Sequence, residues 1–423
     1  MRRWRRSAPR FALFLITLVG LIGFVDRIVV NALVEPLKAE FGLSDQQIGL
    51  LGFAYSALNI VLGVVVARFA ESRRRLTFTT VGTLLWSIAA TGCGFVQSWY
   101  QLLAARIAVG IGEAVGLPAN QSLVADYFPP NRRATAMSVL LLAAPLGAFV
   151  GLAGGGYVAQ IWGWRWAFIV TGLPGIVIAG VIWLFLKEPA RGGHDAAADD
   201  AVPPIGAVVR RFLELPSARH LVIGSAIGAM IGFGLIAFLS ALMTRRFGLS
   251  VGDAGLTTAL ISSIPAAIST IAGGVIADRL APRFPSSYAL VPAISLLLAA
   301  PLYLIAFTRG DLAPFVVFTM LAAVLQFSFL GVTVGTLQNM MHPRMRATAN
   351  ALTNIFGGLI GGMGPVIVGT LSDRLAGAGL PSHLALGHAM AGAALMSLWA
   401  AAHYFIAART VAADLAMVRE GRL

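Results

Sequence analysis

The stretch RRATAMSVLLLAAPLGAFVG at residues 132–151 has a counterpart in MRATANALTNIFGGLIGGMG at residues 345–364. Both contain R-A-T-A and both continue into a glycine-rich apolar run. The segments GVVVARFAESRRR (63–75) and GVIADRLAPR (274–283) also match, because each closes an apolar run with a glycine-led basic turn. Internal repeats of this size are typical of transporters made of two related halves, with the substrate expected between the halves near the membrane midplane.

The composition is that of a membrane protein. Apolar residues make up 58% of the 423 residues and charged residues only 12%, whereas soluble domains carry roughly 25% charged residues. Apolar runs of about 20 residues, enough to cross about 30 Å of hydrocarbon, recur along the chain. Their continuity excludes alternating barrel strands, so we predict an all-α membrane protein.

We predict twelve membrane-spanning helices in two pseudo-symmetric six-helix bundles. The polar segment KEPARGGHDAAADDAVPPIGAVVRRFLELPSAR separates the bundles and has a linker's composition. The predicted domains are an N-terminal half (1–187), a cytoplasmic linker (188–217) and a C-terminal half (218–423). The predicted spans are 11–34, 46–67, 77–96, 100–125, 134–158, 165–186, 218–243, 253–277, 286–307, 312–338, 347–372 and 385–408.

The basic residues indicate the topology. Apart from Arg27 and Arg106, 23 of the Lys and Arg residues lie at the termini, in the linker and in the loops on the same side, and six lie on the opposite side. The positive-inside rule therefore places both termini and the linker in the cytoplasm, and we expect a bacterial inner membrane. The net charge of +13 is spread over short clusters, which disfavours nucleic acid as a partner. The basic N-terminus followed by an apolar run resembles a signal peptide, but without a small-residue cleavage site we expect a retained helix.

Two charges interrupt the first apolar run, LIGFVDRIVVNAL (21–33). Arg27 is about 10 Å deep at 1.5 Å per residue. A charge at that depth costs at least about 2.5 kcal/mol and normally faces a partner, the bundle interior or a water-filled path. Adjacent helical side chains do not face each other, so we expect Asp26 and Arg27 to have different partners.

The fourth predicted helix supplies candidates for both partners. Arg106 lies about 9 Å deep and Glu113 about 20 Å deep on the same helix face. This arithmetic places Arg106 level with Arg27 and places Glu113 farther from both arginines. Glu113 therefore fits proton coupling better than Asp26, and Arg27 or Arg106 fits an anionic headgroup. The alternative is a buried network that only fixes two helices against each other.

Several stretches resemble a known family. The two halves, the linker and the glycine-led basic loops resemble the major facilitator superfamily. VDRIVVNALVEPLKAEFGLSDQQIGLL (25–51), RIAVGIGEAVGLPANQSLVADYFPPNRRATAM (106–137) and GWRWAFIVTGLPG (163–175) resemble its Spinster-like branch. The resemblance implies that proton coupling and substrate charge fall on the Asp26, Arg27, Arg106 and Glu113 positions. One departure is Ala67, where the superfamily loop carries an Asp; Glu71 is a candidate substitute.

Weaker candidates surround the same predicted site. Polar residues proposed to bind substrate, each also suited to helix packing, are Asn31, Tyr55, Asn59, Gln326, Asn339 and Asn354. Charged residues proposed to gate the cytoplasmic side are Arg68, Glu71, Asp126, Asp278 and Arg279. The histidines have no metal-ligand spacing and no phosphate-binding loop is present, so we expect no metal, cofactor or enzymatic activity.

The sequence thus predicts a monomeric secondary transporter that uses alternating access and is coupled to protons. The preferred substrate is an amphiphilic anion such as a lysophospholipid or a sphingoid phosphate, because two arginines suit a headgroup and the apolar C-terminal half suits a tail. Its expected partners are this anion, protons and membrane lipids. Alternatives are a proton-coupled symporter of small carboxylates or sugar acids, a multidrug exporter and, from another class, a non-transporting membrane sensor.

Overall fold

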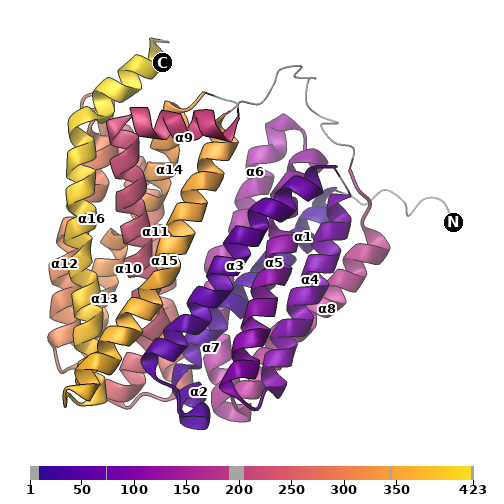
Figure 1. Cartoon of the computed structure of the whole chain (residues 1–423), viewed down its shortest axis with the longest axis vertical. Helices are drawn as coiled ribbons and strands as arrows, with labels where there is room; N and C mark the ends of the chain where they lie inside the picture. The colour runs from indigo at the N-terminus through magenta and orange to yellow at the C-terminus, as the bar shows by residue number, and fades with distance from the viewer. Residues whose placement is uncertain (1–8, 73, 190–203, 343–344, 421–423) are drawn as a thin grey trace. The chain divides into compact units, whose positions relative to one another are not determined.

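The computed structural model describes residues 9–72, 74–189, 204–342 and 345–420, and within them the secondary structure is entirely helical. Figure 1 shows and labels the helices. In chain order they are α1 (Pro9–Ala32), α2 (Val34–Phe41), α3 (Asp45–Ser72), α4 (Arg75–Gly92), the 3₁₀ turn η1 (Cys93–Phe95), α5 (Trp99–Tyr127), α6 (Pro130–Leu141), α7 (Ala143–Trp162), α8 (Trp164–Phe185), α9 (Ile205–Glu214), α10 (Pro216–Phe247), α11 (Val251–Leu280), α12 (Ser287–Thr308), α13 (Leu312–Gln326), α14 (Phe329–Met340), α15 (Arg346–Gly377) and α16 (Ser382–Arg419).

Eleven helical segments in the described part of the chain are long and apolar enough to cross a membrane. They match eleven of the twelve predicted spans, with α6–α7 and α13–α14 each forming one span. The remaining predicted span, 46–67, coincides with α3, a helix of 28 residues. The multi-pass helical membrane fold predicted from hydropathy is therefore confirmed.

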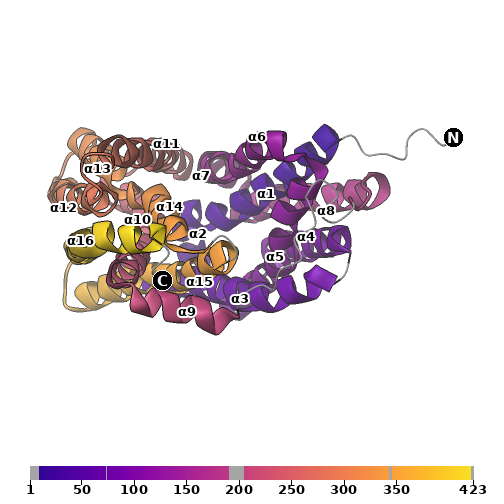
Figure 2. The ribbon, with the colours of Figure 1, turned by 90° about the horizontal axis from the view of Figure 1, so that it is seen from above.

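The chain divides into two compact units. Unit 1 comprises Met1–Leu43, Leu50–Asp199 and Gly248–Ala259, and unit 2 comprises Ser44–Gly49, Asp200–Phe247 and Leu260–Leu423. In unit 1, α1 packs along α7, and α4 packs against both α5 and α8. In unit 2, α10 packs against α15 and α16, and α12 packs against α13 and α16; Figure 2 shows α10, α15 and α16 side by side.

Glycine permits the closest helix contacts in both units. A Cβ on Gly112 of α5 would lie 2.5 Å from the backbone nitrogen of Trp86 in α4. A Cβ on Gly364 of α15 would overlap the backbone carbonyl oxygen of Met230 in α10. Any larger residue would push these helices apart, so the glycine-rich runs seen in the sequence fix helix packing in the apolar interior.

The segment predicted to be a linker contains a helix that the sequence analysis did not anticipate. Residues 188–217 were assigned to a linker from their Ala, Asp, Pro and Gly content, but Ile205–Glu214 forms α9. Val208 of α9 is fully buried and packs near Met341 and Ala349. Tertiary packing of an apolar face, which a composition argument does not register, accounts for this helix.

Candidate functional site

The four charged residues singled out in the sequence meet in unit 1 as two ion pairs between α1 and α5. Asp26 Oδ2 accepts a hydrogen bond from Arg106 Nη1 at 3.0 Å, and Arg27 Nη2 lies 3.2 Å from Glu113 Oε2. Arg106 Nη2 also donates to the backbone oxygen of Asp26 at 3.4 Å. Neighbours in sequence therefore have different partners, as the helical geometry of α1 predicted.

The predicted position of Glu113 was wrong. Depth arithmetic placed this carboxylate farther from both arginines, but it is a direct partner of Arg27. The estimate counted only helical rise along each axis and gave no length to the side chains. An extended arginine and glutamate together close an axial offset of several ångströms, so Cα depth alone does not determine which charges pair.

Tyr55 of α3 joins the two ion pairs. Its hydroxyl accepts a hydrogen bond from Arg27 Nε at 2.8 Å and donates to Glu113 Oε2. The guanidinium carbons of Arg27 and Arg106 lie 5.1 and 5.3 Å from the centre of its ring. Cation–π contacts at this range are favourable, especially away from water, so one aromatic ring organises both arginines.

A glycine allows α3 to come this close to α5. A Cβ on Gly110 of α5 would lie 2.6 Å from the backbone oxygen of Tyr55. One turn further along α3, Asn59 Nδ2 donates at 3.4 Å both to the Gly110 carbonyl oxygen and to Glu113 Oε2. The G-I-G-E sequence at 110–113 thus couples a tight helix crossing to the placement of a buried carboxylate.

Accessibility distinguishes Arg27 from the other three charged residues. Asp26, Arg106 and Glu113 are buried, whereas the Arg27 side chain is 34% exposed. Its Nε and Nη2 donate to Tyr55 and Glu113. The third guanidinium nitrogen, Nη1, has no hydrogen-bond partner among the described residues. A planar guanidinium in this setting can bind a carboxylate or phosphate without first breaking its contact to Glu113.

The two oxygens of Glu113 have different environments. Oε2 is the acceptor for Arg27, Tyr55 and Asn59. Oε1 is buried and has no hydrogen-bond partner in the described part of the chain. Gly23 of α1 lies next to it, since a Cβ on this glycine would be 3.7 Å from Oε1. A proton on Oε1 would leave all three donors on Oε2 in place.

The other candidates proposed to bind substrate lie elsewhere. Asn31 is half-buried in α1. In unit 2, the buried amide of Gln326 donates to the Gly228 carbonyl oxygen at 3.2 Å and accepts from Ser397 Oγ at 3.3 Å. Asn339 and Asn354 are exposed on α14 and α15. Gln326 is therefore engaged within the packing of unit 2, whereas both of these asparagines present their amides at its surface.

The residues proposed to gate fall into three groups. The side chains of Arg68 and Glu71 lie outside the described residues. Asp278 is exposed and accepts a hydrogen bond from the Tyr288 hydroxyl at 3.1 Å, and Arg279 is exposed next to it. Asp126 pairs with the buried Arg75 at 2.5 Å.

Arg75 has a second acidic partner besides Asp126, namely Glu188, which the sequence analysis did not identify. Glu188 lies 3.1 Å from Arg75 Nε and also accepts the backbone N–H groups of Arg75 and Leu76, which begin α4. A carboxylate at a helix N-terminus satisfies unpaired amides and interacts favourably with the helix dipole. The contact joins residues 113 positions apart in the chain, so no local sequence signal identifies it.

A second cluster, in unit 2, was also missed. Arg245 donates through two nitrogens to the two oxygens of Asp45, at 2.7 and 2.8 Å, and Ser372 Oγ donates to Asp45 Oδ2. Asp373 accepts the backbone N–H groups of Asp45 and Gln46 at the start of α3. The sequence does contain a local signal for the start of α3, because Ser44 and Gln47 have the spacing of a capping box and bond reciprocally.

Comparison with known proteins agrees with this fold. Residues 15–365 match the Major Facilitator Superfamily. The chain is 33% identical over 382 residues to an MFS-type efflux pump of Mycolicibacterium smegmatis, covering 88% of this chain and 86% of the relative. It is 28% identical over 396 residues to human protein spinster homolog 1, covering 87% of this chain and 74% of the relative.

Solved structures give the same result. A bacterial homolog of the human lysosomal transporter Spinster, solved in an inward-facing and unoccupied conformation, matches with a TM-score of 0.87 and 28% identity. The match covers 98% of this chain and 99% of that structure. The nucleoside transporter NupG, at a TM-score of 0.74 and 11% identity, shares the fold. The chain is a transporter of the Major Facilitator Superfamily and belongs to its Spinster-like branch.

Proposed function

We propose that this transporter is coupled to protons through Glu113 and moves an amphiphilic organic anion, of the lysophospholipid or sphingoid phosphate type, by alternating access. The observation that carries the proposal is the pairing of a buried carboxylate that has one unpartnered oxygen with a partly exposed arginine 3.2 Å away. Protonation of Glu113 weakens its hold on Arg27, and an anion on Arg27 compensates for the lost negative charge. Proton and substrate thereby affect each other's binding at one guanidinium.

One further observation supports a lipid-like substrate. Unit 2 exposes large apolar side chains on α10 and α15, namely Phe233, Phe356 and Met363. An acyl chain needs an apolar surface of this kind, while the headgroup needs a cation.

Flux into proteoliposomes tests the proposal. Purified protein is reconstituted with an imposed pH gradient, and uptake of a fluorescent anionic lysolipid is compared with uptake of a neutral analogue carrying the same acyl chain. We expect uptake of the anionic compound only, driven by the gradient and stopped by a protonophore. Uptake insensitive to the gradient would overturn proton coupling, and equal uptake of the neutral analogue would overturn the role of Arg27.

A second candidate function follows from the 33% identical relative, which is an efflux pump. An exporter of varied apolar compounds would move the neutral analogue and would not depend on an anionic group. Uptake of small carboxylates alone would instead favour the symporter of small anions. If none of these compounds moves faster than through protein-free liposomes, all three proposed substrate classes are wrong.

A further inference from the structure

Helix α9 carries a wider apolar face than unit 2 covers. Val208 is fully buried, and Phe212 packs into the same cluster against Met341 and Ala349. On the same helix, Ile205, Val209 and Leu213 are 51%, 40% and 61% exposed. Three large apolar side chains therefore form an exposed stripe at a spacing of four residues, which places them on one line along the helix.

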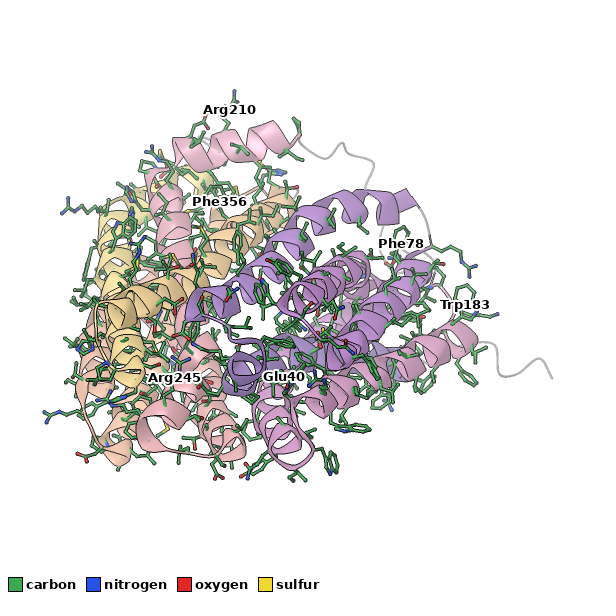
Figure 3. The ribbon with its side chains drawn as sticks, turned by 60° about the horizontal axis from the view of Figure 1, so that its bottom comes forward. Glu40, Phe78, Trp183, Arg210, Arg245 and Phe356 are labelled. Carbon is green, nitrogen blue, oxygen red and sulfur yellow. The ribbon has the colours of Figure 1, made fainter. Side chains whose placement is uncertain are left out.

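The stripe is the continuation of the buried face. At about 100° per residue, Val208, Phe212, Ile205, Val209 and Leu213 follow one another around about 140° of the helix. The protein covers the first part of this arc and leaves the second part open. Arg210 and Glu214 lie on the opposite side, and Figure 3 shows Arg210 pointing away from the body of unit 2. This is the pattern of a helix at a boundary between protein, an apolar medium and water.

The position of α9 is fixed by the helix that follows it. Only Leu215 separates Glu214, the last residue of α9, from Pro216, the first residue of α10. The junction is rigid, because Leu215 is fully buried and the backbone and hydroxyl of Ser217 both donate to Asp414. The α10 helix has 32 residues, about 48 Å in length, whereas the hydrocarbon core is about 30 Å thick. The ends of α10 therefore reach the headgroup region.

Figures 1 and 2 show how α9 lies with respect to its neighbours in unit 2. It runs across the end of α10 rather than along it, and it lies beside the end of α15 at the edge of the unit. A helix held at headgroup depth and at an edge presents its open flank to the lipid. Near α9, the first part of α10 also has an exposed apolar side chain, Ile223.

The charges next to the stripe favour an anionic surface. Arg210, Arg211 and Arg219 lie on or beside α9, against one carboxylate, Glu214. Arg210 is 78% exposed and its pairing with Glu214, at 3.3 Å, is a solvent-exposed contact of small energetic value. Basic side chains bordering an apolar stripe are typical of helices that lie in the interface of membranes containing anionic lipids.

We infer that α9 is an interfacial membrane-binding helix, with Ile205, Val209 and Leu213 inserted among the lipids and Arg210 at the headgroups, on the side that the basic residues predict to be cytoplasmic. This function is independent of the transport proposal. It makes the connection between the two halves a lipid-contacting element, so the lipid composition of that leaflet acts directly on the start of α10.

Spin labels on the full-length protein in vesicles test the inference. The one native cysteine, Cys93, is buried, and a Cys93→Ser background leaves a single introduced cysteine to label. Val209→Cys and Leu213→Cys report on the stripe, and Arg210→Cys and Glu214→Cys are matched controls on the opposite side. Accessibility to oxygen, which dissolves in lipid, is compared with accessibility to a water-soluble nickel complex. The vesicles are phosphatidylcholine with or without phosphatidylglycerol.

We expect labels at 209 and 213 to be at least five-fold more accessible to oxygen than to nickel, and labels at 210 and 214 to show the reverse. Phosphatidylglycerol should increase this difference, and Arg210→Gln in the Val209→Cys protein should remove the increase. Nickel accessibility at 209 equal to that at 210 would place the stripe in water and overturn the inference. Protection of 209 and 213 from both reagents would also overturn it, because protein rather than lipid would then cover the stripe.

Discussion

The two units have the same architecture but bury different chemistry. The middle of unit 1 holds two ion pairs, Asp26–Arg106 and Arg27–Glu113. In the middle of unit 2 the helices are joined through neutral groups, such as Thr333 Oγ1 at 2.6 Å from the Tyr404 hydroxyl. Its least exposed described charges, Asp45, Asp414 and Arg245, lie near helix ends. The repeated sequence therefore produces the same helical architecture in both units, whereas the ion pairs Asp26–Arg106 and Arg27–Glu113 distinguish unit 1.

The largest expected effect is on stability, from Arg106→Ala. This change leaves Asp26 without its partner in an environment where it is 0% exposed. Breaking a buried ion pair from one side costs about 3–5 kcal/mol. Thermal unfolding in detergent should show a large destabilisation, and Arg309→Ala, at an exposed position, serves as the control. The double variant Asp26→Asn/Arg106→Leu should recover much of the loss, and no recovery would argue against the pair as its cause.

Glu113→Gln should remove proton coupling without removing substrate binding. The amide keeps the size of the protonated carboxyl but does not titrate. We expect accumulation driven by a pH gradient to fall at least ten-fold, while exchange of labelled for unlabelled lysolipid across equal pH continues. Asp311→Asn, at an exposed site, is the matched control. Gradient-driven accumulation at the wild-type level would exclude Glu113 as the coupling residue.

Arg27→Ala should weaken binding of the anionic lysolipid. A hydrogen bond to a charged group contributes about 1.5–3 kcal/mol, which corresponds to roughly a 10-fold to 100-fold loss of affinity. Arg27→Lys should recover part of it, because the charge returns without the planar fork. Equilibrium binding measured on monodisperse protein checks this expectation. Affinity within a factor of two of wild type would remove Arg27 from the substrate site.

Thr333→Val tests the neutral interior of unit 2. The change keeps the shape of the side chain but leaves the buried Tyr404 hydroxyl without its partner. We expect a loss of about 1–3 kcal/mol in the free energy of unfolding, with no change in the response of transport to a pH gradient. Thr308→Val, at an exposed position, is the control. An altered pH response would show that coupling extends into unit 2.

The smallest effect is expected from an exposed pair in unit 1. Hydrogen bonds from Arg165 and then from Trp164 lower the pKa of Glu40 below its ordinary value. A lowered carboxyl pKa stabilises the fold above the unfolded-state pKa, and this contribution disappears as the pH falls through the folded-state pKa. Because the pair is solvent-exposed, Glu40→Gln should cost under about 1 kcal/mol at pH 7. Unfolding curves of the variant and wild type should converge in acid; a constant gap would contradict this origin.

The residues that sequence analysis singled out and that the structure brings together share one property. Asp26, Arg27, Arg106 and Glu113 were conspicuous because a charge in hydrocarbon is costly whatever its partner. The residues that it missed, such as Glu188 and Arg245, lie at helix ends, where charges are common and carry no such cost. The resemblance to the Spinster-like branch pointed to the same four positions in unit 1 and gave no guidance on these end contacts.

The sequence by itself determined the membrane class, the positions of the spans, the internal duplication and the four charges that meet between α1 and α5. These features depend on hydropathy and on the cost of charge in lipid, which are properties of segments and single residues. Only the tertiary structure decided that Asp26 pairs with Arg106, that Arg27 pairs with Glu113, and that the Tyr55 ring lies between the two arginines. Such pairings depend on side-chain reach and on the closeness of helices at Gly110, which are set by three-dimensional packing rather than by position along the chain.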